Sequence, residues 1–70
     1  MAETTGQRLR RLRGNRTLKE VSEATGLAIS TLNMYEHDIR TPREDNKQKL
    51  ADYYKRTVPY IFYGAGARNT

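Results

Sequence analysis

The chain has 70 residues, of which 13 are Lys or Arg and 8 are Asp or Glu, giving a formal net charge of +5 at pH 7. A domain of this size buries only about 60% of its unfolded surface, so a deep catalytic cleft is not expected. The absence of cysteine excludes disulfides, thiolate metal sites and cysteine nucleophiles, and the positive charge favours a polyanionic partner, with nucleic acid ahead of a membrane.

The first predicted helix begins at Thr4 and ends at Gly14-Asn15. Thr4 and Gln7 have the spacing of a capping box, in which each side chain bonds the backbone N–H of the other residue. Leu9 and Leu12 recur at helical spacing and form a narrow apolar face. Around this face lie the arginines Arg8, Arg10, Arg11, Arg13 and Arg16.

The second predicted helix is the segment TLKEVSEATG, in which Thr17 and Glu20 repeat the capping-box spacing. Gly26 closes this helix, because the tight turn needs a left-handed backbone that costs a residue with a Cβ about 1 kcal/mol or more. Leu27 follows and is expected to fill the inner corner of the turn. The apolar positions of the helix are Leu18, Val21 and Ala24 or Thr25.

The third predicted helix covers residues 28–37 and overlaps the uncharged stretch ATGLAISTLNMY. Helical spacing divides its residues into two stripes, and one stripe must face away from the core. An uncharged outward stripe is unusual on a solvated helix, but it suits contact with the edges of DNA bases. The inner stripe is Ala28, Leu32 and Tyr35, and the outer stripe is Ile29, Ser30, Asn33 and Met34.

A fourth helix is predicted from a third capping-box spacing, between Thr41 and Glu44. Pro42 would then stand at the first helical position, where its missing N–H costs no hydrogen bond. This helix is expected to run to about Tyr54.

The last predicted element is capped by Thr57 and contains four consecutive apolar residues, 60–63. Consecutive residues point all round a helix, so at least one aromatic ring should stay exposed. The expected organisation is an N-terminal tail at 1–5, one domain at 6–63 and a mobile C-terminal tail at 64–70.

Four segments of the chain match one known pattern. They are Leu9-Arg10-Arg11-Leu12-Arg13, the motif TLKEVSEATGLAISTLNMYE from Thr17 to Glu36, Arg40-Thr41-Pro42, and Val58 with Ile61-Phe62. Together they resemble the Cro and repressor-type (XRE-like) helix-turn-helix family of phage and bacterial regulators, over about residues 6–63. The resemblance implies an all-α, compact five-helix, lambda-repressor-like DNA-binding domain with a central helix-turn-helix, whose third helix enters the DNA major groove.

The resemblance also implies which residues contact DNA. It places the outer stripe, Ile29, Ser30, Asn33 and Met34, against base edges, where Asn33 can bond adenine through two hydrogen bonds. Ile29 or Met34 could instead cover the core or pack against a neighbouring chain. The expected phosphate contacts are Thr17 with the first amides of its helix, Lys19, Arg40 and Arg43. Leu18 replaces a Gln that commonly helps to hold a phosphate in the family.

The resemblance also implies a dimer surface, because the surface near the last helix of such proteins often lies against a second subunit. Tyr60 and Tyr63 are therefore candidates for a dimer contact, the alternative being ordinary exposed tyrosines.

Two further features concern charged and titratable residues. Glu36 is similar to a family residue that pairs with an arginine of the first helix, here Arg13, and the alternative is two solvated charges. His37 is the only histidine, and its neighbours on a helix end point in different directions, so a solvated histidine is expected rather than a metal site. No catalytic constellation or phosphate-binding glycine loop is present, which predicts no enzyme activity and no cofactor.

The resulting prediction is a sequence-specific transcriptional regulator, a small phage or prokaryotic repressor that binds double-stranded operator DNA as a homodimer. The N-terminus does not resemble a signal peptide, and the longest apolar run is far too short for a bilayer, so a cytoplasmic, nucleoid-associated protein is expected. No membrane partner and no small-molecule effector are evident. The alternatives are a protein-interaction module on the same fold, such as an adaptor or antitoxin-like partner, and a nonspecific nucleic-acid binder.

Overall fold

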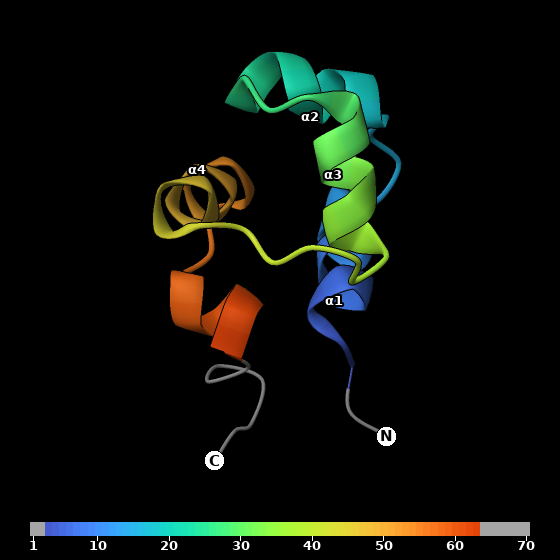
Figure 1. Cartoon of the computed structure of the whole chain (residues 1–70). Helices are drawn as coiled ribbons and strands as arrows, with labels where there is room; N and C mark the ends of the chain where they lie inside the picture. Colours follow the sequence, from blue (N-terminus) through green and yellow to red (C-terminus); the bar gives the residue numbers. More distant parts are fainter. Residues whose placement is uncertain (1–2, 64–70) are drawn as a thin grey trace.

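The computed structural model describes residues 3–63 and contains five helices in that range, with no strand among them. They are α1 (Thr5–Arg13), α2 (Leu18–Thr25), α3 (Ile29–Glu36), α4 (Glu44–Tyr54) and η1 (Pro59–Tyr63), the last a single π-helical turn. In Figure 1, α3 runs alongside α1, α2 crosses the beginning of α3 at a steep angle, and α4 and η1 lie together on the other side. The predicted all-α, five-helix domain is confirmed.

Helix α1 is held at both ends by local hydrogen bonds. Thr4 and Gln7 form the predicted capping box, and Gly14, with φ at 59°, ends the helix. The helix therefore begins inside residues 1–5, which were expected to form a tail. Arg8 was expected at the rim of the apolar face, but it is buried, because its guanidinium Nη1 donates to the carbonyl oxygen of Ile61 at 2.6 Å.

The corner between α2 and α3 follows the sequence prediction closely. Thr17 and Glu20 form the second capping box, and Gly26 adopts the left-handed conformation with φ at 80°. The N–H of Leu27 donates to Thr25 Oγ1 at 3.2 Å, and that hydroxyl donates in turn to the carbonyl of Val21 at 2.8 Å. These bonds turn the buried Leu27 side chain into the inner corner.

The predicted start of the fourth helix is wrong. The N-cap of α4 is Arg43, without a side-chain capping bond, and the Thr41–Glu44 capping box does not form. Pro42 instead precedes the N-cap and is buried. An apolar residue at this position commonly packs back onto the helix, and here burial of the proline ring outweighs the capping bonds. The predicted end at Tyr54 is confirmed, with Lys55 in the left-handed region at φ 58°.

The hydrophobic core draws on every helix. The buried apolar residues are Leu9, Val21, Leu27, Leu32, Tyr35, Leu50, Ala51, Tyr54 and Ile61. The segment before η1 is capped as predicted, since the N–H of Tyr60 donates to Thr57 Oγ1 at 3.1 Å. Within residues 3–63, no helix combines the length and apolarity needed to cross a bilayer. The tail predicted at 64–70 lies outside the described residues.

Candidate nucleic-acid interface

Helix α3 presents a polar and apolar face to solvent without a single charge. Ile29 is 46% exposed, Ser30 and Asn33 are exposed, and Met34 is half-buried. The opposite face carries the buried residues Leu32, Tyr35 and Glu36. The prediction that Ala28 belongs to the inner stripe is wrong. Ala28 is the exposed N-cap and has an extended backbone. It therefore lies outside the helical spacing, and its side chain does not join the buried face of α3.

An ion pair fixes α3 to α1. Arg13 donates from Nε and Nη2 to the two carboxylate oxygens of Glu36, at 2.7 and 3.0 Å. The side chain of Glu36 is only 6% exposed and that of Arg13 is 21% exposed. Hydrogen bonding to Glu36 raises the pKa of Arg13, with the opposite charge adding to the effect. A fork-on-fork pair of this kind restricts both side chains, so the outward face of α3 has a fixed orientation on the scaffold.

The N-terminus of α2 holds two of the predicted phosphate contacts, Thr17 and Lys19. The hydroxyl of Thr17 accepts from the Glu20 N–H at 3.1 Å, and Glu20 Oε1 accepts from the Thr17 N–H at 2.8 Å. The capping box thus engages both the N–H and the hydroxyl of Thr17, and it places the exposed carboxylate of Glu20 at the same helix end. Lys19 is exposed and, among the described residues, has no ion-pair partner, so it is better placed than Thr17 to meet a phosphate.

A polar hollow of about 320 Å³ lies between α3 and the start of α4, and it brings Arg40 and Arg43 together. Thr31 of α3 lines the same hollow. Sequence analysis missed Thr31, because it belongs to neither stripe of α3. Its position next to Ser30 of the outer stripe could have indicated that it lies near the proposed interface. Asp45 also lines the hollow, so the positive charge there is partly offset.

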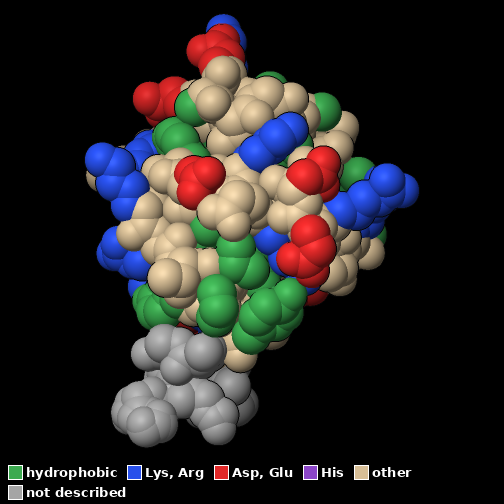
Figure 2. Space-filling view, turned by 90° about the vertical axis from the view of Figure 1, so that its left-hand side faces the viewer, with side chains coloured by type: hydrophobic (Ala, Val, Ile, Leu, Met, Phe, Trp, Pro, Cys, Tyr) green, Lys and Arg blue, Asp and Glu red, His purple; other side chains and the backbone are tan. Residues whose placement is uncertain are grey.

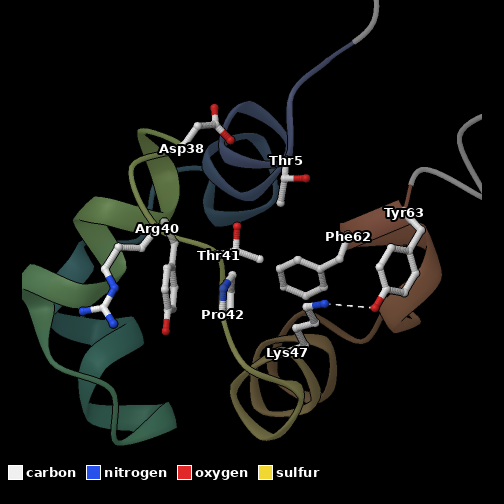
Figure 3. Close-up of a pocket in the computed structure, with 9 residues that line it drawn as sticks. Thr5, Asp38, Arg40, Thr41, Pro42, Lys47, Phe62 and Tyr63 are labelled. Atoms are coloured by element: carbon white, nitrogen blue, oxygen red, sulfur yellow. Dashed lines mark hydrogen bonds between the residues drawn. The ribbon is translucent and has the colours of Figure 1, made fainter.

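A second hollow, of about 150 Å³, lies between the α3–α4 segment and η1 (Figure 3). The buried Lys47 lines it and donates to the hydroxyl of Tyr63 at 2.9 Å and to Glu44 Oε2 at 3.3 Å. The bond to Tyr63 is the main cause that raises the pKa of Lys47. In Figure 3, Arg40 extends away from this pair, so its guanidinium is separate from the Lys47 cluster.

The two candidate dimer residues both have partners within the chain. The hydroxyl of Tyr60 accepts from Arg11 Nη2 at 3.3 Å, a bond that lowers the pKa of Tyr60. Tyr63 is 59% exposed although its hydroxyl meets Lys47. Figure 2 shows hydrophobic side chains gathered on the face that carries α4 and η1, with charges of both signs around them.

His37 stands at the C-terminal end of α3 and is exposed. Its ring lies 2.9 Å from the carbonyl oxygen of Asn33 through Nδ1, and 3.3 Å from Arg10 Nη2 through Nε2. Residues 3–63 contain no cluster of three or more His, Asp or Glu side chains that could hold a metal ion. The histidine is thus attached to α1 and to the backbone of an outer-stripe residue.

A protein-family model described as helix-turn-helix matches residues 7–61, which is most of the chain and runs from within α1 into η1. No curated protein and no solved structure gives a significant match.

Proposed function

Because the chain belongs to the Cro and repressor-type (XRE-like) helix-turn-helix family of DNA-binding regulators, we propose that it is a sequence-specific repressor that binds operator DNA as a homodimer. The supporting observation is the uncharged, exposed face of α3, flanked by cations on neighbouring segments. Uncharged polar and apolar groups can distinguish bases through hydrogen bonds and methyl contacts, without the sequence-independent attraction to phosphates that a charge would add.

Base readout is assigned to the outer stripe of α3. Asn33 would bond adenine N6 and N7, Ser30 can donate or accept a hydrogen bond, and Ile29 or Met34 would contact thymine methyl groups. Each good contact of this kind contributes about 1–3 kcal/mol of discrimination between bases. The Arg13–Glu36 pair supports the proposal, because it holds the reading face in one orientation.

Phosphate contacts are assigned to two positions on either side of α3. Arg40 and Arg43 share the polar hollow beside Thr31, and Lys19 stands at the start of α2. These contacts would position the domain on any duplex and supply affinity without sequence preference. Thr17 would assist only through the amides of the α2 N-terminus, since Glu20 already occupies its hydroxyl and N–H.

Homodimerisation is proposed because one short helix reads only a few base pairs, and two-fold partners can read half-sites about one helical turn apart. The exposed ring of Tyr63 supports the surface of η1 as the contact between the two subunits. Sedimentation of the chain with and without a duplex gives the stoichiometry directly. A Tyr63→Ser variant that stays folded should shift the population toward monomer, and an unchanged population would exclude Tyr63 from the contact.

The decisive experiment selects bound duplexes from a random library and then measures two variants on selected and random DNA. Asn33→Ala should lose preference for the selected sequence with little loss of nonspecific affinity, whereas Arg43→Ala should weaken both duplexes alike. Equal effects of the two variants on every sequence would refute base readout by α3 and favour a nonspecific binder with a steep salt dependence. If function in cells depends on Tyr60 and Tyr63 but not on Asn33, a protein-interaction module is favoured instead.

A further inference from the structure

The arginines of α1 and of the turn after it differ in the groups that their guanidinium groups contact. Among the described residues, Arg8 and Arg11 pair with Glu3, and Arg13 pairs with Glu36. Arg16 lies over the rings of Tyr53 and Tyr54, at 5.3 and 5.8 Å. Arg10 is the exception, because its side chain meets the ring of His37 rather than a carboxylate or a π-face.

Among the described residues, no carboxylate lies within ion-pair distance of Arg10. Glu36 is taken by Arg13, and Asp38 Oδ1 accepts the backbone N–H of Gly6 at 2.8 Å. The Arg10 side chain is exposed and forms no ion pair in residues 3–63, so its guanidinium can meet an anion from solvent. The negative end of the α3 dipole attracts the Arg10 guanidinium. Any cation would be attracted in the same way, and this attraction does not fix the direction in which the guanidinium points.

His37 continues the outward face of α3. It follows Asn33 by four residues and Ser30 by seven, the spacings that place side chains on one side of a helix. The contact between Nδ1 and the Asn33 carbonyl requires the ring nitrogen to donate, because a carbonyl oxygen only accepts. In the neutral ring Nε2 is then the acceptor for Arg10 Nη2. This chain of two bonds directs the guanidinium to the C-terminal end of the reading face.

We propose that Arg10 is an additional DNA-backbone contact, held in position by His37. The inference rests on the proposed function, because it assumes that the face carrying Asn33 meets the duplex. An arginine has five N–H donors, so Arg10 can keep its bond to His37 and still donate to a phosphate oxygen. Arg10 would add a third DNA-backbone contact, on α1, to those proposed at the α2 N-terminus and at the Arg40–Arg43 hollow.

The test measures affinity for a selected and a random duplex over a series of salt concentrations. Arg10→Gln retains an amide donor for His37 but removes the charge. It should weaken both duplexes by about five- to tenfold and reduce the slope of log K against log salt by about one. Arg56→Gln is the matched control, since it removes the same charge from an exposed side chain that, within residues 3–63, bonds only the carbonyl of Lys55. This control should change affinity less than about twofold.

The positioning role of His37 has its own readout. His37→Gln can still accept from Arg10 and should keep nearly full affinity, whereas His37→Ala should lose part of the Arg10 effect while the thermal unfolding midpoint stays close to that of the native chain. If Arg10→Gln behaves like Arg56→Gln while Arg43→Ala still weakens binding, this inference alone is overturned. Failure of the native chain to bind any duplex would overturn it together with the proposed function.

Discussion

The guanidinium of Arg13 and the carboxylate of Glu36 meet through two hydrogen bonds of 2.7 and 3.0 Å, although 23 residues separate them in the chain. Glu36 is the last residue of α3 and belongs to its buried face. The pair therefore joins the scaffold to the helix that carries the proposed base contacts. The same guanidinium donates from Nη1 to the carbonyl of Arg16 at 2.7 Å, so it also holds the turn between α1 and α2.

Glu36→Gln should destabilise the fold by about 2–3 kcal/mol, between the values for exposed and fully buried ion pairs. The substitution keeps the shape of the side chain but leaves a partly buried guanidinium without its counter-charge. Urea unfolding measures the change. Glu3→Gln is the control, because the Glu3 side chain is 29% exposed against 6% for Glu36. Its buried partner Arg8 keeps its bonds to the carbonyls of Ile61 and Glu3, so this substitution should cost less than about 1 kcal/mol. Equal losses for the two variants would contradict the role of the Arg13–Glu36 pair.

The glycines at positions 26 and 6 predict two different kinds of defect when each is replaced by alanine. Gly26→Ala should cost about 1 kcal/mol from backbone strain alone, since φ is 80° and a Cβ there would have no heavy atom within 4 Å. At Gly6 a Cβ would lie 2.5 Å from the carbonyl oxygen of Glu36, which forces α1 and α3 apart. Gly6→Ala should therefore cost about 3 kcal/mol.

The same unfolding measurement decides between these outcomes. The order of the two losses is the informative result, because residue type and substitution are identical. A larger loss at Gly26 than at Gly6 would show that the close approach of α1 to Glu36 relaxes easily in solution.

Most of the fold was predictable because its determinants are local. The capping boxes at Thr4 and Thr17 and the turn at Gly26 each depend on residues within four positions of one another. The capping box predicted at Thr41 failed because burial of Pro42, a tertiary effect, competes with a local hydrogen-bond pattern. Local spacing alone could not show which of the two would prevail.

The charged side chains show where sequence reasoning stopped. Burial of Arg8 depends on the carbonyl of Ile61, which lies 53 residues away, and burial of Lys47 depends on Tyr63 and Glu44. Glu44 is a local partner on the same helix, but Ile61 and Tyr63 reach these side chains only when the chain is folded. The outer stripe of α3 was visible from periodicity, whereas the contact between Arg10 and His37 needed the packing of α1 beside α3. That the outer stripe contacts DNA bases stays a prediction.

Tyr54 predicts a loss of stability in alkali. Burial, with the nearby Glu36 carboxylate adding to it, raises the pKa of Tyr54 from 10.0 to about 12. The folded state holds the phenolic proton more tightly than the unfolded chain, so this stabilisation is complete below pH 10 and is lost as the pH rises toward 12. The free energy of unfolding of Tyr54→Phe should fall less steeply above pH 10 than that of the native chain. Parallel slopes would contradict the shift, and tyrosinate absorbance provides an independent titration.

Glu20 sets a carboxylate at the α2 N-terminus, where Thr17 and Lys19 are proposed to meet a phosphate. Glu20→Gln should preserve the capping box, because a glutamine oxygen accepts the same backbone N–H, and should leave stability within about 0.5 kcal/mol. Loss of the negative charge should raise affinity for any duplex by about three- to tenfold at low salt, with the gain shrinking as salt increases. Glu23→Gln removes the same charge one turn further from that helix end and should change affinity less. If Glu20→Gln binds no tighter than Glu23→Gln, the α2 N-terminus does not lie against the DNA backbone.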